Sequence, residues 1–240
     1  MKNNALAVLF ASDEDSHLND LTIHRTTASL PYAGRYRLID FVLSNLVHAN
    51  ITKIGIITRN NYNSLMDHIR QGRDWDLNRK NSGISVYPPF VFNAAHEVYK
   101  GKIEALYMLR GFMLKSSEDY VVISNTNIAF NIDFDEVAKF HLERGADITM
   151  LTYATEDVTP RKLVVTADKN KRIKDLRFPV STDTGRQLCN LNIYYIKKDL
   201  LISLIDNAYA HGAYDFEKDI LRASLDELYV MSYEIDNYVA

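Results

Sequence analysis

The sequence has 240 residues and a formal net charge of −3, with 47% hydrophobic and 25% charged residues. This composition is ordinary for a soluble globular protein, and the length fits one large α/β domain as easily as two small ones. Nucleic-acid binding requires a concentrated basic face, which the thinly spread lysines and arginines do not provide. No apolar run is long enough to cross a bilayer and no signal-peptide pattern follows Met1, so we expect a cytoplasmic protein without nucleic-acid or membrane partners.

The scarcity of cysteine and glycine narrows the chemistry further. The only cysteine, Cys189, excludes an internal disulfide and a zinc cluster of thiolates. We interpret it as a small apolar residue in a strand rather than as a reactive thiol. The chain has 9 glycines, against about 17 expected at the usual frequency of ~7%. A protein that cradles phosphate with its backbone would normally contain more glycine.

In the first half of the chain, strand-like and helical patterns alternate. Apolar runs predict strands at 5–11, 51–58 and 120–125, and helical spacing predicts helices at 36–50, 61–72, 103–114 and 133–145. Gly72 and Gly145 are typical helix stops, and Asp133 is a typical N-cap. We interpret residues 73–102, which contain Pro88 and Pro89, as irregular excursions.

The second half predicts a sheet of mixed direction. Strands are expected at 147–153, 162–168, 172–176, 188–196 and 227–235, and helices at 199–212 and 215–225. No internal repeat or linker interrupts the pattern. We therefore expect one domain, 1–240, of the α/β class, with a Rossmann-like, mixed, mostly parallel sheet and helices on both faces.

A ligand of such a sheet would lie outside the carboxyl ends of the strands, near the loops after Ala11, Asn125 and Ile196. The first loop carries Asp13, Glu14 and Asp15. A carboxylate about 6 Å from a phosphate charge costs roughly 3 kcal/mol at an effective dielectric constant of about 20. The same acids could hold a divalent cation, but we favour a solvated acidic loop, with His17 as a surface residue.

Three motifs resemble the N-terminal nucleotidyltransferase domain of the ADP-glucose pyrophosphorylases, also called glucose-1-phosphate adenylyltransferases. They are LPYAGRYRLIDFVLSN at 30–45, LTIHR at 21–25 and DHIRQGRDWDL at 67–77. The resemblance runs through nearly the whole chain. It implies the fold of the nucleotide-diphospho-sugar transferases and a reaction that joins ATP and glucose 1-phosphate into ADP-glucose and pyrophosphate for glycogen synthesis. The family continues into a left-handed β-helix that is absent from this chain, so we expect a fragment of a longer protein.

The departures from the family pattern fall at positions that the resemblance assigns to nucleotide and metal binding. The glycine-rich loop of the family, which ends in an arginine, corresponds to the segment with Asp13 and Asp15, whereas Arg25 is retained. The aspartate that holds the catalytic magnesium in the family corresponds to Thr126, a neutral and weak ligand. The second metal carboxylate, in HGAYDFEKD at 211–219, remains as Asp215. We expect Asp215 to be a lone remnant rather than a metal site.

The sugar-phosphate positions depart in the same way. The lysine that binds the sugar phosphate in the family corresponds to Phe178, and the Ala-Ser-Met-Gly turn corresponds to Cys189-Asn190-Leu191-Asn192. Tyr99 and Gly101 match the Tyr-x-Gly of the family, but Lys102, Ile103 and Glu104 replace its Thr-Ala-Asp. We therefore expect no catalytic residue, no cofactor and a vestigial ligand pocket, made of Arg25, Tyr99, Gly101, Asn190 and Asp215.

The combined losses resemble the GlgD-type subunits of this family. The resemblance implies a regulatory, non-catalytic subunit that forms a cytoplasmic hetero-oligomer with a catalytic paralogue and raises its activity. One alternative is a weakly active nucleotidyltransferase in which Asp215, with Asp13 or Asp15, holds Mg²⁺. A second alternative is a sensor that binds a sugar phosphate or nucleotide around Arg25, Tyr99 and Asp215 without turning it over.

Other polar residues of the motifs have simpler structural interpretations. We expect Arg37 and Asp40 to orient the first helix, Asn45 to be a satisfied polar group of that helix, and Trp75 to anchor the 73–102 excursion by packing.

Overall fold

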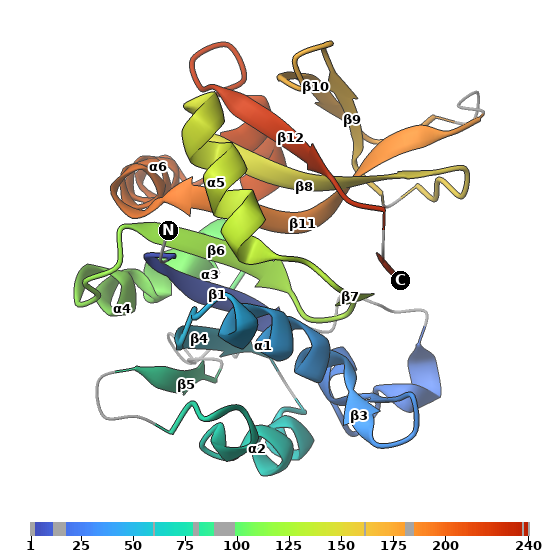
Figure 1. Cartoon of the computed structure of the whole chain (residues 1–240), viewed down its shortest axis with the longest axis vertical. Helices are drawn as coiled ribbons and strands as arrows, with labels where there is room; N and C mark the ends of the chain where they lie inside the picture. The colour runs from blue at the N-terminus through green and yellow to red at the C-terminus, as the bar shows by residue number, and fades with distance from the viewer. Residues whose placement is uncertain are drawn as a thin grey trace.

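The computed structural model describes residues 3–11, 18–59, 61–78, 82–88, 99–160, 162–180, 185–236 and 238–239. Within these ranges the chain forms a mixed sheet covered by helices on both faces, as predicted (Figure 1). The strands of the main sheet are β1 (Ala5–Ala11), β4 (Lys53–Thr58), β5 (Gly83–Tyr87), β6 (Tyr120–Asn125), β8 (Ile148–Thr155), β9 (Val164–Ala167), β10 (Ile173–Arg177), β11 (Gln187–Lys197) and β12 (Val230–Glu234).

Strand direction changes between the two halves of the chain. The spatial order is β10-β9-β11-β6-β1-β4-β5, and β8 pairs with both β11 and β12. Strands β6, β1, β4 and β5 are parallel to their neighbours in this group. Strand β11 runs antiparallel to β6, β8 and β9. The second half is therefore mixed, as predicted.

Alternation along β1 assigns its side chains to two separate cores. Ala5, Ala7 and Leu9 join one buried cluster, whereas Leu6 and Val8 join the other. This period of two is what a strand buried on both faces requires. The first cluster is covered by α1 (Leu38–His48), α2 (Asn63–Ile69) and α5 (Phe134–Arg144). The second is covered by α3 (Lys102–Met108), α4 (Arg110–Leu114), α6 (Lys198–Ala210) and the helix η4 (Phe216–Arg222).

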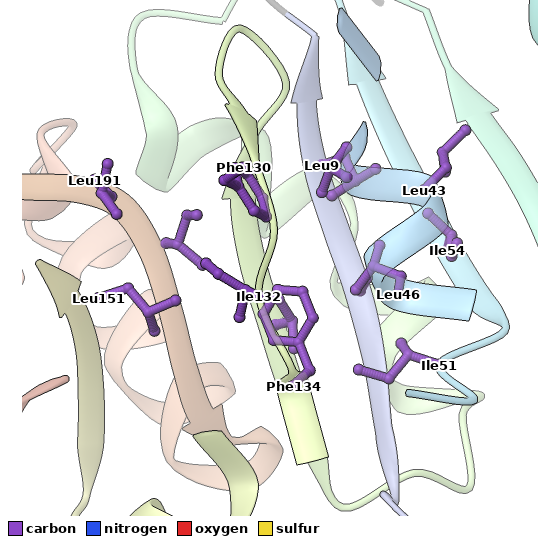
Figure 2. Packing of buried hydrophobic residues seen from close by; sticks show 14 of the residues in the cluster. Leu9, Leu43, Leu46, Ile51, Ile54, Phe130, Ile132, Phe134, Leu151 and Leu191 are labelled. Atoms are coloured by element: carbon purple, nitrogen blue, oxygen red, sulfur yellow. The ribbon is translucent and has the colours of Figure 1, made fainter. Parts of the chain in front are cut away.

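Figure 2 shows how the first cluster joins the two halves of the sheet. Leu43 and Leu46 on α1 lie over Leu9 of β1 and Ile54 of β4, and Phe134 begins α5 beside them. Phe130 and Ile132 continue the cluster toward Leu151 of β8 and Leu191 of β11. Because one continuous apolar layer spans both halves, the sheet holds its edge loops on a common, rigid support.

The predicted ends of α5 are confirmed. Asp133 lies at the N-cap and accepts hydrogen bonds from the backbone amides of Asp135 (2.9 Å) and Glu136 (3.4 Å). Gly145 ends the helix in the left-handed conformation, at φ 58°, which glycine adopts without steric cost. Gly72 also has a positive φ, 72°, but α2 ends three residues earlier, at Ile69.

Three sequence interpretations need correction. The 73–102 segment is not only irregular, because Gly83–Tyr87 forms β5 at the edge of the sheet. Its side chains are mostly half-buried, so its apolar pattern is weak. The predicted helix at 103–114 is divided at Leu109 into α3 and α4, and the helix predicted at 215–225 is the π-helix η4.

The structure also contains several elements of two or three residues that the sequence did not predict. They are η1 (Asn19–Leu21), η2 (Thr27–Ser29), η3 (Arg73–Trp75), β2 (Pro31–Tyr32), β3 (Tyr36–Arg37), β7 (Ala129–Phe130) and β13 (Tyr238–Val239).

The motif residues with structural interpretations have structural partners. The backbone amide of Arg37 donates to Asp40 (2.9 Å) at the start of α1, while the Arg37 guanidinium donates to Ser64 on α2. Asn45 donates to the carbonyl of Phe130 (2.8 Å). The Trp75 side chain packs against the first core cluster.

Two further sequence expectations concern burial and membrane association. Cys189 is a free, buried cysteine in β11, and its burial raises the pKa of the thiol. This agrees with a structural role. Among the described residues, no helix combines the length and apolar character needed to span a membrane.

Burial of His141 makes the stability of the fold pH-dependent. The side chain is 3% exposed, its Nδ1 lies 2.9 Å from Thr149 Oγ1, and the Tyr120 and Tyr195 rings pack against it. Burial lowers the pKa of His141 to about 4, although Asp147 opposes the shift. Because the unfolded imidazole titrates near 6.5, the unfolded chain binds the extra proton first, and stability is lost as the pH falls from about 6.5 toward 4.

We therefore expect the free energy of unfolding to fall by about 2 kcal/mol between pH 7 and pH 5 through this residue. Urea unfolding at the two pH values, compared between the parent chain and His141→Gln, measures the effect. The exposed His48 supplies a matched control, since His48→Gln should leave the pH dependence unchanged. An equally steep loss of stability in His141→Gln would refute the assignment.

Candidate functional site

The residues of the candidate site meet at one edge of the sheet. Since β1, β4 and β6 are parallel, their carboxyl ends lie at the same edge. Strand β11 is antiparallel and pairs Ile193 with Ser124, so its first half reaches this edge too. The register of β11 against β8 shifts between Asn190 and Tyr194, and Asn192 within that shift has φ 58°. Asparagine tolerates this left-handed conformation, and the irregularity brings Asn190, Asn192 and Tyr194 into one network.

An ion pair between Lys102 and Glu217 crosses the site. Lys102 is the first residue of α3 and Glu217 the second residue of η4, and their side chains are 14% and 16% exposed. The Lys102 ammonium also lies 3.3 Å from the amide oxygen of Asn192. The pair thus joins two helical elements to β11 across a partly desolvated space, where opposite charges interact more strongly than in bulk water.

A hydrogen-bond relay supports the carboxylate of Glu217 from the side of β11. The Asn190 amide donates to the Tyr194 hydroxyl at 2.6 Å, and this hydroxyl donates to Glu217 Oε1 at 3.0 Å. Complete burial raises the pKa of Tyr194, and the Glu217 and Asp215 carboxylates add to the shift. The phenol therefore stays protonated at neutral pH and acts as a donor to Glu217.

Gly101 lies directly against the backbone of Tyr214. A Cβ atom added to Gly101 would lie 2.9 Å from the carbonyl carbon of Tyr214 and still closer to its oxygen. The backbone amide of Ile103 donates to the same carbonyl at 3.3 Å. Close packing therefore accounts for Gly101, independently of any ligand.

Tyr99 is also buried, at 6% exposure. It lies beneath the Arg59 guanidinium, which is 4.6 Å from the centroid of the tyrosine ring.

The retained aspartate, Asp215, is used by the start of its own helix. Its carboxylate accepts a hydrogen bond from the Lys218 backbone amide at 2.8 Å as the N-cap of η4. Asp219 accepts from the backbone amides of Tyr214 (3.2 Å) and Asp215 (3.1 Å). Both carboxylates satisfy backbone donors at this turn, so each has a structural role.

The other predicted positions have partners of their own or are at least partly exposed. Thr126 follows β6, is 2% exposed, and donates its hydroxyl to the carbonyl of Phe10 on β1 at 3.1 Å. Phe178 follows β10 and is 55% exposed. Arg25 is half-buried just before η2. No hydrogen bond or ion pair seen within the described ranges joins these three residues to Asn190, and the acidic loop with Asp13 and Asp15 lies outside the described residues.

Within the described ranges, which leave out the acidic loop, the side chains at this edge do not fit a magnesium ion of the kind that the resemblance implies. The Thr126 hydroxyl is directed to Phe10, Asp215 caps η4, and Glu217 is paired with Lys102. In the described part of the chain, no group of three or more histidine, cysteine, aspartate or glutamate residues is placed to hold a metal ion. Magnesium requires near-octahedral oxygen ligands with carboxylate charge, and the described side chains at this edge do not supply such a set.

Sequence reasoning missed the roles of Asn192, Tyr194 and Glu217, and noted Lys102 only as a departure. A signal was available, because Lys102 and Glu217 are complementary charges located in two separate motif segments. Their pairing follows only from the distance between α3 and η4, which the sequence does not specify.

Comparison with known proteins identifies relatives that match nearly all of the chain. A family model described as nucleotidyl transferase matches residues 6–238. The chain is similar to a glucose-1-phosphate adenylyltransferase from Geobacillus stearothermophilus, with 28% identity over 231 residues, 95% of this chain and 59% of that protein. It is also similar to the glycogen biosynthesis protein GlgD of the same organism, with 33% identity over 224 residues, 92% of this chain and 55% of that protein.

A second protein named glycogen biosynthesis protein GlgD, from Bacillus subtilis (strain 168), is 38% identical over 147 residues, which are 61% of this chain and 43% of that protein. The chain therefore spans little more than half the length of the relatives that match nearly all of it.

Proposed function

The chain belongs to the nucleotidyl transferase family, and we propose that it is the nucleotidyltransferase-like part of a regulatory, non-catalytic subunit of glucose-1-phosphate adenylyltransferase in glycogen biosynthesis. In this proposal it assembles in the cytoplasm with a catalytic paralogue and raises the activity of that paralogue. The names of the GlgD relatives support the pathway. The regulatory role is supported by the chemistry of the site.

The observation that carries the proposal is the Lys102–Glu217 ion pair beside Asp215. Phosphoryl and nucleotidyl transfer require positive charge aimed at the phosphate oxygens, from lysine, arginine or a metal ion. Here the Lys102 ammonium is paired with the Glu217 carboxylate of the same chain. The neighbouring acid Asp215 is engaged in capping η4, so it is poorly placed to recruit a metal ion.

Two replaced positions support the same proposal. The Thr126 side chain is neutral, buried and hydrogen-bonded to Phe10, so it offers no charge to a cation. The Phe178 ring is exposed and apolar, so it offers no charge to a phosphate group. Without charge at these two positions, the site is poorly suited to stabilising the charge that develops during nucleotidyl transfer.

ADP-glucose formation from ATP and glucose 1-phosphate, with magnesium, tests the proposal. The natural full-length polypeptide that contains this chain should form no ADP-glucose above background when assayed alone. Added to the catalytic paralogue from the same cell, it should raise the rate of that enzyme severalfold. A heat-unfolded sample of the same polypeptide is the control, and it should leave the rate of the paralogue unchanged.

Turnover by the polypeptide alone would contradict the proposal if Asp215→Asn abolished it. That result would establish a weakly active nucleotidyltransferase, with Asp215 as a metal ligand. Absence of any rate increase in the mixture would contradict the regulatory part of the proposal, provided that gel filtration shows the two proteins to be folded.

A further inference from the structure

We propose that Lys102 and Tyr194 form a binding site for a phosphate group, and that the Glu217 carboxylate occupies this site in the free protein. The chain thereby carries its own competitor for a phosphate monoester. The inference deepens the proposed function and rests on it for the identity of the pocket. Its physical basis is the set of groups that surround one glutamate oxygen.

The donors around Glu217 are those that hold a phosphate oxygen in other proteins. The Lys102 ammonium pairs with Glu217 Oε1, and the Tyr194 hydroxyl donates to the same oxygen at 3.0 Å. An ammonium group has three donors and a protonated phenol has one, and neither requires a carboxylate in particular. A phosphate oxygen has the same charge preference and accepts hydrogen bonds in the same way.

The phenol is fixed in its donor role by its surroundings. Asn190 is 6% exposed and donates its amide to the Tyr194 hydroxyl at 2.6 Å, while its own oxygen accepts from the Asn192 backbone amide at 2.9 Å. The Tyr194 hydroxyl oxygen thus accepts a hydrogen bond from Asn190, and the hydroxyl proton can be donated to an acceptor such as an anion. A buried, oriented donor of this kind is preorganised for an anion rather than for a metal ion.

A ligand could enter the site if the Glu217 side chain moved, without any change in the core. Lys102 and Glu217 retain 14% and 16% exposure, so the ion pair lies at the boundary between core and solvent. Glu217 is carried by η4, a π-helix of seven residues, whereas Tyr194 and Asn190 belong to the long strand β11. A ligand that displaced the carboxylate would rearrange one side chain and leave the sheet in place.

Substitution of Glu217 tests the proposal through binding alone. Isothermal titration with inorganic phosphate and with glucose 1-phosphate should detect binding to Glu217→Gln that is at least tenfold tighter than to the parent chain. Glu217→Ala, which also removes volume, should bind at least as tightly as Glu217→Gln. The double variant Lys102→Met/Glu217→Gln should lose the gain, because it lacks the ammonium.

Glu118→Gln is the matched control, because Glu118 pairs with Lys53 at a similar exposure, 20% and 18%, away from the network. It should gain no phosphate binding. Equal binding to the parent and Glu217→Gln, or binding retained by the double variant, would overturn the proposal in chains whose thermal unfolding shows them to be folded. Binding to glucose 1-phosphate but not to inorganic phosphate would indicate that the sugar is also recognised. No catalytic paralogue is present, so failure here leaves the rate experiment above as an independent test of the proposed function.

Discussion

Replacing Thr126 with aspartate is expected to destabilise the fold by about 3 kcal/mol or more, and not to create a metal site. Thr126 is 2% exposed, and its hydroxyl donates to the carbonyl of Phe10 at 3.1 Å. The substitution removes this hydrogen bond and places a negative charge against the carbonyl oxygen that accepted it. A buried, unpaired carboxylate carries a desolvation cost of several kcal/mol.

Urea unfolding of the parent and variant chains measures this change, and two further variants separate its causes. Thr126→Ser keeps the hydroxyl and should stay within about 1 kcal/mol of the parent, whereas Thr126→Val loses only the hydrogen bond and should cost about 1 kcal/mol. Because burial raises the pKa of a carboxyl group, the destabilisation by Thr126→Asp should be largest at high pH and should decrease as the pH falls. Stabilisation of Thr126→Asp by added magnesium would instead mean that other ligands already lie in place around this position.

Gly101→Ala is expected to destabilise the fold by about 3 kcal/mol, at the upper end of the usual cost of overpacking. The new methyl group would meet the backbone carbonyl of Tyr214, with the carbonyl carbon at 2.9 Å and the oxygen closer. A backbone carbonyl cannot rotate away as a flexible side chain does. Either α3 or the segment before η4 must move, and such a shift would also disturb the Lys102–Glu217 pair.

Gly111 provides a matched control for this substitution. It lies within α4, and a Cβ added there meets nothing within 4 Å. Gly111→Ala should therefore stabilise the fold by about 0.5–1 kcal/mol, through helix propensity alone. Thermal unfolding of both variants tests the comparison. A different result would assign Gly101 to a ligand pocket instead of to packing. In that case Gly101→Ala would leave the stability unchanged, and adding Gly101→Ala to Glu217→Gln would abolish the phosphate binding that Glu217→Gln gains.

Both predictions bear on whether a charged side chain can be introduced at this edge of the sheet. The Thr126 hydroxyl makes a buried hydrogen bond, and Glu217 of the Lys102–Glu217 ion pair lies two residues along the chain from Asp215. Introducing one further charged side chain at either place therefore acts against the contacts already present there. Contacts of this kind make the effects of neighbouring substitutions non-additive.

The apolar pattern by itself determined most of the strands and helices, including β1, β6 and α5 with its caps at Asp133 and Gly145. These elements are long or strongly alternating, so local periodicity carries their signal. Strand β5 was not predicted, because an edge strand is only half-buried and its alternation of apolar and polar residues is weak. The resemblance to the family, rather than the apolar pattern, distinguished Thr126 and Phe178 as replaced positions and Asp215 as a retained one, since these positions are defined by residue type within a motif.

The tertiary structure alone decided which side chains meet at this edge of the sheet. Lys102 and Glu217 are 115 residues apart in the chain, and their pairing depends on the position of α3 relative to η4. Asn190 and Tyr194 belong to one network because β11 changes register between them. Distances of this kind result from how two helical elements pack on a twisted sheet, and that packing is a sum over many core contacts rather than a property of any local segment.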